Sequence, residues 1–278
     1  MRAAIDVGSN SVRLGLSDGE KYSTITKLAD GLNASGALSR DGAERSLRAI
    51  SEYVKKATDT GCRACDIKIF ATEAVRRARD GALFCDKVKT ATGISVTVLS
   101  PEDEARYALL GAKKPSGAVS VCDLGGGSME LISSFDGVTP EYVKSLPLGV
   151  VVLKNTFDGD YRKAIDAAPA LVAEYGETKN YPLVMIGGSA CSIAAAEKNL
   201  RCYDKTAVNG AYISAARLDE LMPMLLSPKL SVFRPVCAKR ADTLPYGAII
   251  IQALLNHIGA RGFYVSDSDN LDAALNMK

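Results

Sequence analysis

Two short apolar runs flank a glycine-rich turn near the middle of the chain. Residues 119–124 and 129–132 are mostly apolar, and Asp123 opens the turn that contains Gly125, Gly126 and Gly127. The same layout occurs at the start of the chain, where residues 3–7 and 12–16 flank the turn Gly8-Ser9-Asn10-Ser11. Both patterns predict a β-hairpin.

The two hairpins agree position by position. Asp6, Gly8 and Ser11 fall at the offsets of Asp123, Gly125 and Ser128. A single turn of this kind is usually only a turn, but backbone N–H groups without an intervening Cβ can bind a phosphate, and a carboxylate beside them can hold a cation. The repetition therefore favours a duplicated architecture in which two loops face a shared phosphate group.

Strands and helices alternate along the rest of the chain. Apolar residues at a helical period predict a helix over 41–60, with Asp41 and Glu44 as its capping pair. Buried strands are predicted at 67–71 and 182–186, further strands at 94–99 and 263–265, and further helices at 82–91, from Ser100, at 161–175, at 214–226, behind Pro245 and at 271–275. This succession indicates an α/β fold. The break at Lys113–Gly117 divides it into residues 1–117 and 118–278, and leaves open whether the terminal helix returns to the first domain.

The composition argues against several classes of partner and of catalytic site. The formal net charge is +2, which does not favour nucleic acid, and no run of 18 apolar residues suggests a membrane span. Seven scattered cysteines suggest a reducing compartment, so we expect a soluble cytoplasmic protein. The sole histidine, His257, argues against Ser-His-Asp catalysis and histidine-rich metal sites, which leaves carboxylates, arginines and backbone amides.

Two strand ends carry candidate ligand groups. Arg76, Arg77 and Arg79 follow the strand 67–71, where open α/β sheets bind ligands, although a solvated basic turn would look the same. Gly187-Gly188-Ser189 follows the strand 182–186 and opens a helix. This junction fits a site for a second phosphate or a nucleotide, and it equally fits close strand–helix packing.

Ser100 and Pro101 form a strong helix start, followed by Glu102, Asp103 and Glu104. Acids in a first turn complement the helix dipole, and nothing in the local pattern distinguishes Glu104 from its neighbours.

Taken together, these motifs resemble the exopolyphosphatase and guanosine pentaphosphate phosphohydrolase family. The matching segments occur in the family's order and are residues 6–14, 71–76, 102–106, 123–131, 145–149 and 187–190.

The resemblance implies two ribonuclease-H-like domains of the acetate and sugar kinase, Hsp70 and actin superfamily, with the active site in the interdomain cleft. It also implies hydrolysis of the terminal phosphoanhydride bond of inorganic polyphosphate or guanosine pentaphosphate, with Mg²⁺. By the same resemblance, Glu104 is the catalytic residue that activates water, and Asp6 and Asp123 are metal ligands. The implied phosphate-binding residues are Ser9, Asn10, Ser11, Arg76, Gly126, Gly127 and Ser128, and Gly187, Gly188, Ser189 and Arg240 are candidate substrate-binding residues.

The chain departs from the family pattern in two ways. It lacks the C-terminal helical domains of longer members, which suggests short polyphosphate chains as substrates. Residues 266–274 lack the arginine and glycine that the family usually has there, which affects substrate contacts. A catalytically weak sensor that binds polyphosphate or guanosine polyphosphates is the alternative, a small-molecule kinase ranks third, and a homodimer is the candidate assembly.

Overall fold

The computed structural model describes residues 1–268 and 270–276. The chain forms two compact units, one made of Met1–Tyr107 and the terminal segment from Asn270, the other of the residues from Ala108 up to that segment. The predicted boundary after Gly117 falls inside the second unit.

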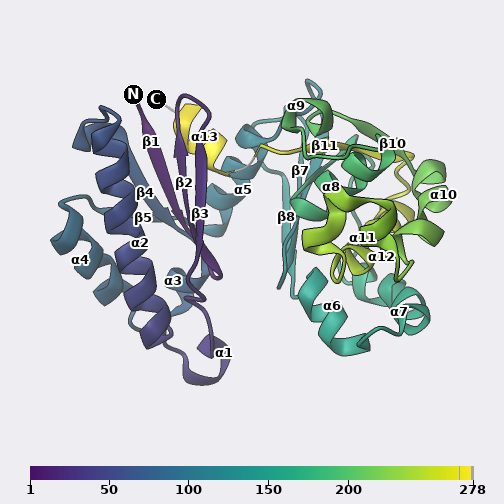
Figure 1. Ribbon diagram of the computed structural model, residues 1–278, viewed down its shortest axis with the longest axis horizontal. Helices are drawn as coiled ribbons and strands as arrows, with labels where there is room; N and C mark the ends of the chain where they lie inside the picture. The colour runs from purple at the N-terminus through teal and green to yellow at the C-terminus, as the bar shows by residue number, and fades with distance from the viewer. Residues whose placement is uncertain (269, 277–278) are drawn as a thin grey trace. The chain divides into compact units, whose positions relative to one another are not determined.

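Figure 1 labels the elements along the chain. The first unit contains β1 (Ala3–Val7), β2 (Ser11–Leu16), β3 (Lys21–Ile25), α1 (Leu32–Ser35), α2 (Arg40–Asp59), η1 (Ala64–Asp66), β4 (Ile67–Ala71), α3 (Glu73–Arg77), α4 (Gly81–Thr92), β5 (Val96–Val98), the start of α5 (Pro101–Gly111), and α13 (Asn270–Asn276). The second unit begins with the end of α5. Its further elements are β6 (Val119–Leu124), β7 (Met129–Ser134), β8 (Tyr142–Leu146), α6 (Val150–Phe157), α7 (Tyr161–Ala173), β9 (Leu183–Ile186), α8 (Gly188–Glu197), α9 (Lys205–Val208), β10 (Tyr212–Ser214), α10 (Ala215–Leu225), α11 (Leu230–Phe233), η2 (Pro235–Arg240), α12 (Leu244–Ile258) and β11 (Gly262–Ser266).

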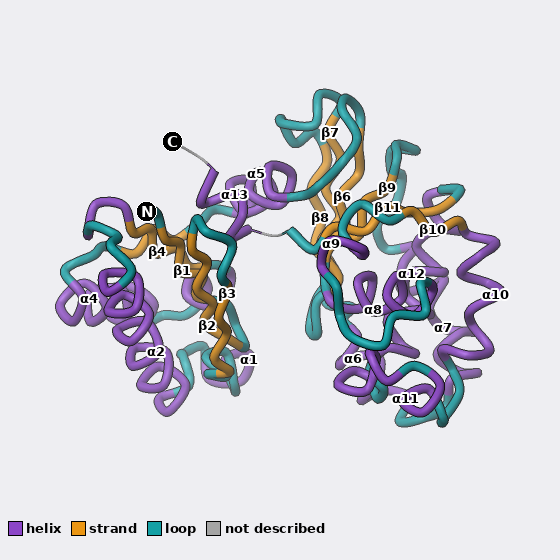
Figure 2. The backbone as a smooth tube through the Cα atoms, turned by 45° about the horizontal axis from the view of Figure 1, so that its top comes forward, coloured by secondary structure: helices purple, strands orange, loops and turns teal. Residues whose placement is uncertain are grey.

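The first sheet has the strand order β3-β2-β1-β4-β5. β2 pairs antiparallel with both β1 and β3, whereas β4 pairs parallel with both β1 and β5. Every residue of β1 is buried, as expected for a central strand that is covered on both faces. The amphipathic helix α2 packs beside α4 on one face, and α13 contacts β1 and β2 (Figures 1 and 2).

The second sheet repeats this design. Its order is β10-β11-β9-β6-β7-β8, with β6, β7 and β8 antiparallel and β6, β9 and β11 parallel. β6 therefore corresponds to β1, β7 to β2, β8 to β3 and β9 to β4, with β10 added at the edge. The predicted α/β class and both predicted hairpins are confirmed.

Helix positions follow the sequence pattern closely, but the predicted cap of α2 is wrong. The helix begins at Arg40, and Ser39 is its N-cap, because the Ser39 hydroxyl accepts a hydrogen bond from the Gly42 N–H at 3.2 Å. Asp41 lies inside the first turn, and Glu44 forms an ion pair with Arg40 at 3.7 Å. The helix therefore begins one residue earlier than the pattern predicts.

The terminal helix α13 belongs to the first unit. Leu271 and Leu275 lie against Gly15 of β2, where a Cβ on the glycine would stand 3.3 Å from each. Lys21 of β3 forms an ion pair with Asp272 at 2.7 Å. Asp269, part of the segment that departs from the family pattern, lies outside the described residues. Among the described residues, no helix combines the length and the apolar character needed to cross a membrane.

Candidate active site

The turn between β1 and β2 is held in place through its carbonyl groups. Gly8 closes it with a hydrogen bond from its N–H to the Ser11 carbonyl at 3.0 Å. Behind it, the Asn10 carbonyl accepts hydrogen bonds from the N–H groups of Thr26 and Lys27, each at 2.9 Å. The Ser9 carbonyl accepts from Ala29, also at 2.9 Å. The segment after β3 thus supports the turn from one side.

The turn between β6 and β7 is built in the same way. Gly125 donates to the Ser128 carbonyl at 3.0 Å, as Gly8 does to Ser11. The Gly125 carbonyl accepts from Val150 at 3.1 Å, and the Gly126 carbonyl accepts from Val151 at 2.9 Å. Both donors stand in the first turn of α6, so the helix start after β8 supports the second loop.

Exposed N–H groups remain on both turns. Ser9, Asn10, Gly126 and Gly127 are exposed, and within residues 1–268 and 270–276 their backbone N–H groups donate to no protein acceptor. Adjacent backbone N–H groups of this kind are suited to binding an anion such as phosphate. Each unit therefore presents one amide-lined loop, formed by the predicted residues.

Asp6 lies just before the first turn, and only 3% of its surface is exposed. Arg13 stands directly opposite it on β2. The Arg13 guanidinium donates from Nε to Asp6 Oδ2 at 3.0 Å and from Nη2 to the same oxygen. This pair was not predicted, although counting outward from the turn would have placed the two residues opposite each other in a regular hairpin.

Glu104 and Arg76 are brought together from two helices of the first unit. Arg76 Nη1, on α3, lies 3.2 Å from Glu104 Oε2 on α5 and donates to the Leu99 carbonyl at 2.6 Å. The Ser100 hydroxyl accepts from the Asp103 N–H at 3.1 Å, which confirms Ser100 as the predicted cap of α5. This cap fixes the helix start that carries Glu104.

Burial raises the pKa of the Glu104 carboxyl above its usual value, and the charges of Asp6 and Glu73 act in the same direction. The hydrogen bond and the positive charge of Arg76 oppose this shift. The Glu104 side chain is 28% exposed, so it still reaches solvent. A partly desolvated carboxylate with a raised pKa is a better proton acceptor than an ordinary surface glutamate.

Asp123 occupies the position in the second unit that Asp6 has in the first. Its cross-strand neighbour is Glu130, which accepts a hydrogen bond from the Ser145 hydroxyl at 2.6 Å. Gly187, at the end of β9, is adjacent, since a Cβ on it would lie 3.5 Å from Asp123 Oδ1 and 2.7 Å from the Leu124 carbonyl. Its φ of 105° also favours glycine.

Gly188 and Arg240 are neighbours. The Arg240 guanidinium fills the space beside Gly188, where a Cβ would lie 2.1 Å from the guanidinium carbon. Ser189 differs, because its side chain is buried against Gly247 of α12. The second unit thus places Gly187, Gly188 and Arg240 near the end of β9, whereas Ser189 lies in helix packing.

Gly149 is a further residue to which the sequence reasoning gave no role. A Cβ there would lie 2.2 Å from the Gly126 carbonyl oxygen and 2.4 Å from the Gly127 nitrogen. Its φ of −120° is open to any residue, so the requirement for glycine is purely steric. Because contacts of this kind are tertiary, no local sequence signal would have shown it.

The carboxylates offer hard oxygen donors, the type that Mg²⁺ prefers. Within the described parts of the chain, no three His, Cys, Asp or Glu side chains form a cluster able to hold a metal on their own. Mg²⁺ commonly uses one or two carboxylates together with water and substrate phosphates, so Asp6 in the first unit and Asp123 in the second each have the chemistry of one such ligand.

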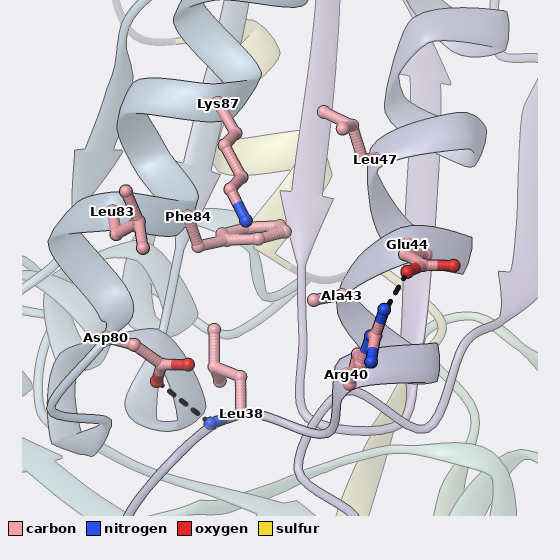
Figure 3. Close-up of a pocket in the computed structure, with 9 residues that line it drawn as sticks. All are labelled: Leu38, Arg40, Ala43, Glu44, Leu47, Asp80, Leu83, Phe84 and Lys87. Atoms are coloured by element: carbon pink, nitrogen blue, oxygen red, sulfur yellow. Dashed lines mark hydrogen bonds and ion pairs between the residues drawn. The ribbon is translucent and has the colours of Figure 1, made fainter.

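A separate cavity of about 340 Å³ lies between α2 and α4. Figure 3 shows Leu83 and Phe84 on α4 facing Ala43 and Leu47 on α2, with the charged side chain of Lys87 beside them. None of the predicted site residues lines this cavity. It is therefore distinct from the candidate site.

Comparison with known proteins shows the family of this chain. The model of the Ppx/GppA phosphatase family matches residues 11–268. The chain belongs to this family. The Ppx/GppA crystal structure of the type II variant from Aquifex aeolicus matches with a TM-score of 0.85 and 29% identity, covering 98% of this chain and 97% of that one. The prediction that the chain has the fold of the Ppx/GppA family is confirmed.

Two curated Ppx/GppA relatives match part of the chain. Exopolyphosphatase 1 of Mycobacterium tuberculosis is 34% identical over 158 residues, which are 52% of this chain and 45% of the relative. Guanosine-5'-triphosphate,3'-diphosphate pyrophosphatase of Pseudoalteromonas atlantica is 32% identical over 188 residues, which are 61% of this chain and 37% of the relative. The matched segments thus span less than half the length of these relatives.

Proposed function

We propose that this protein hydrolyses the terminal phosphoanhydride bond of inorganic polyphosphate, mainly of short chains, or of guanosine pentaphosphate. The substrate class is that of the two curated relatives, whose names refer to polyphosphate and to a guanosine polyphosphate. In this proposal, Glu104 activates the attacking water, and phosphate groups of the substrate bind at the amide-lined loop of each unit. The reaction takes place in the cytoplasm.

The partial burial of Glu104 beside Arg76 is the single observation that carries the proposal. A general base must be ionised and yet basic enough to accept a proton from water. Burial raises the pKa of Glu104, while Arg76 limits the shift and holds the carboxylate at 3.2 Å. No other acid in the first turn of α5 has both features, because Glu102 and Asp103 are exposed.

Phosphoryl transfer mainly requires charge neutralisation and positioning, which amides and an arginine can supply. Ser9, Asn10 and Ser11 would bind phosphate in the first unit, as would Gly126, Gly127 and Ser128 in the second. Arg76 is close enough to Glu104 to contact a phosphate group beside the attacking water. Gly187, Gly188 and Arg240 would bind a more distant part of the substrate, whereas Ser189 is buried and would act through its backbone.

Mg²⁺ is the proposed cofactor, held by Asp6 and Asp123 together with substrate oxygens. When bound, the ion would neutralise charge on the phosphate oxygens. The chain itself supplies the carboxylates, each at the end of a central strand and beside an amide-lined loop.

Phosphate release from tripolyphosphate, long polyphosphate and guanosine pentaphosphate tests the proposal. We expect Glu104→Gln to lower kcat by at least about 100-fold, since general-base catalysis typically contributes that much. Glu102→Gln, an exposed acid two residues earlier on the same helix, is the matched control and should keep wild-type rates.

Equal rates for wild type and Glu104→Gln would reject the assigned base. Tight binding of these substrates without turnover, under varied divalent metals, would instead favour the sensor alternative. The order of rates among the three substrates identifies the preferred chain length and the role of the guanosine group.

A further inference from the structure

The last strand of the second sheet, β11, ends at Ser266, in the segment that departs from the family pattern. Asp123 of β6 and Ser266 both pair with Ile186, the last residue of β9, because β9 lies between their strands. Since neighbouring strands lie about 4.8 Å apart, the next residue, Asp267, follows roughly 10 Å from Asp123 along the same edge of the sheet. This edge also carries Gly187, so Asp267 borders the candidate site of the second unit.

The Asp267 carboxylate is held by neutral groups. The Cys191 thiol, in the first turn of α8, donates to Asp267 Oδ1 at 3.6 Å. Burial raises the pKa of this thiol to about 12, so it stays protonated and acts as a donor. The Tyr203 hydroxyl also interacts with Asp267. Within residues 1–268 and 270–276, no lysine or arginine forms an ion pair with Asp267, so an acid without a cationic partner of this kind stands at the edge.

Tyr203 places an aromatic ring beside this carboxylate. It lies in the loop between α8 and α9, and its hydroxyl interacts with both Cys191 and Asp267. Nevertheless, 48% of the residue is exposed. One end of the side chain is therefore anchored while part of it remains accessible. An accessible aromatic ring of this kind is suited to stacking on a nucleobase.

The two proposed substrates differ in the groups that they would present to these side chains. A polyphosphate chain presents negatively charged oxygens, which a carboxylate repels. A guanosine group presents ribose hydroxyls and the N–H groups of guanine, from which a carboxylate accepts hydrogen bonds. It also presents an aromatic base. An acid beside an accessible aromatic ring therefore favours the nucleoside over a further run of phosphates.

We infer that Asp267 and Tyr203 form a subsite for the guanosine group, so that the protein prefers guanosine pentaphosphate to inorganic polyphosphate. The inference rests on the proposed function and selects between its two substrates. Asp267 accepts hydrogen bonds from the nucleoside, and Tyr203 stacks on the base. A cation for the phosphate groups is close by, because the positive charge of Arg240, which lies beside Gly188, also acts on the Cys191 thiol.

The ratio of kcat/KM for guanosine pentaphosphate to kcat/KM for tripolyphosphate tests the subsite. We expect Asp267→Asn to lower this ratio about tenfold, because the variant loses charge-assisted hydrogen bonds to the nucleoside and no longer repels tripolyphosphate. Tyr203→Ala should lower it to a similar extent through the loss of stacking, whereas Tyr203→Phe keeps the ring and most of the ratio.

Two variants of the second unit are the matched controls for this ratio. Asp166→Asn changes an exposed acid of α7, and Tyr212→Ala removes a similarly exposed tyrosine of β10. Both should keep the wild-type ratio. An unchanged ratio in Asp267→Asn and Tyr203→Ala, or equal losses for the two substrates, overturns the inference. Circular dichroism confirms that each variant is folded, and if Asp267→Asn does not fold, Tyr203→Ala alone decides the outcome.

Binding measurements make the test independent of turnover. Isothermal titration with Mg²⁺ in a Glu104→Gln background gives Kd for guanosine pentaphosphate, GTP and tripolyphosphate. Asp267→Asn and Tyr203→Ala should each weaken both guanosine ligands about tenfold relative to tripolyphosphate. This result supports the inference even if the wild-type protein releases no phosphate from any substrate, which would overturn the proposed function alone. Weaker binding of guanosine pentaphosphate without weaker binding of GTP would show that the 3′-diphosphate is recognised, and it overturns the inference.

Discussion

At the scale of single residues, the ion pair between Arg76 and Glu104 connects two opposing requirements. As the proposed base, Glu104 would have to be basic enough to accept a proton, which its burial favours, and ionised near neutral pH, which Arg76 favours. Arg76 is itself anchored to the Leu99 carbonyl, so its position does not depend on Glu104 alone. The pair therefore tunes the carboxylate while keeping it in place.

Replacing Arg76 should shift the pH dependence of catalysis. Arg76 lowers the pKa of Glu104, so Arg76→Gln raises that pKa further above its usual value. Because the base acts only when ionised, the acid limb of the kcat/KM profile should move to higher pH, by about one pH unit for a lost interaction of about 1.4 kcal/mol. Phosphate release measured from pH 4 to 9 shows the shift.

Arg76→Lys separates charge from shape in this test, since it keeps the positive charge and should leave the acid limb close to that of the wild type. Arg77→Gln alters an exposed neighbour that pairs with Glu73 at 2.8 Å, and it is the control for the helix α3. An unshifted acid limb in Arg76→Gln would show that another group controls the profile.

The local sequence pattern predicts some of these residues and not others. Nothing in the local pattern separated Glu104 from Glu102 and Asp103, and only the family resemblance selected it. Its distinctive burial and its contact with Arg76 depend on tertiary packing between α3 and α5, which no local pattern encodes. Arg13 has a signal in the hairpin register, because counting outward from the turn places it opposite Asp6.

At the scale of elements, each amide-lined loop depends on a segment that follows the third strand of its sheet. The Thr26–Ala29 stretch donates to the first loop and the start of α6 donates to the second. Since these donors satisfy the loop carbonyls, the loops can present their own N–H groups outward. The hairpin alone would not fix this orientation.

Gly149→Ala should disrupt the second loop. The added Cβ would meet backbone atoms of Gly126 and Gly127, which cannot move without displacing the loop. We expect a loss of about 1–3 kcal/mol in the free energy of unfolding, as for other overpacked sites, and a clear drop in tripolyphosphate affinity. Urea unfolding and isothermal titration measure the two effects.

Gly127→Ala is the comparison for stability, because a Cβ at Gly127 would have no atom within 4 Å. It should leave the unfolding midpoint nearly unchanged. A Gly149→Ala protein that unfolds like the wild type and binds tripolyphosphate equally well would show that the loop adapts to the extra methyl group.

The hairpins, the buried strands and the long helices were predictable because their patterns are local and strongly periodic. The start of α2 was not placed correctly, since Asp41 and Glu44 also fit a capping pattern and only the backbone shows that Ser39 holds that position. The close approach of Gly149 to the loop could not be predicted for a different reason, because it brings together segments that are not neighbours in the sequence.

At the scale of the whole molecule, the two units share one strand arrangement but differ in their additions. The second sheet carries an extra edge strand, β10, whereas the first unit is joined by the terminal helix α13. Leu271 of this helix is buried with Phe70 and Leu99 in a small cluster of the first unit. The stability of that unit therefore depends on residues from both ends of the chain.

Leu271→Ala should weaken the first unit selectively. The change removes a side chain that is 1% exposed, and substitutions of this kind cost about 2–5 kcal/mol. Hydrogen exchange followed by mass spectrometry should show faster exchange in β1 and β2, while β6 and β9 keep their protection. Leu83→Ala, at an exposed leucine of α4, is the control. Equal loss of protection in both units would contradict this assignment.

The return of α13 to the first unit also has a consequence for biosynthesis. The ribosome makes the strands β1 and β2 first, but their partner Leu271 emerges only after the entire second unit has been translated. Until then, the face of β2 that includes Gly15 lacks its covering helix. We therefore expect the nascent first unit to stay accessible to proteases and chaperones until α13 has been made, even though most of this unit is synthesised early.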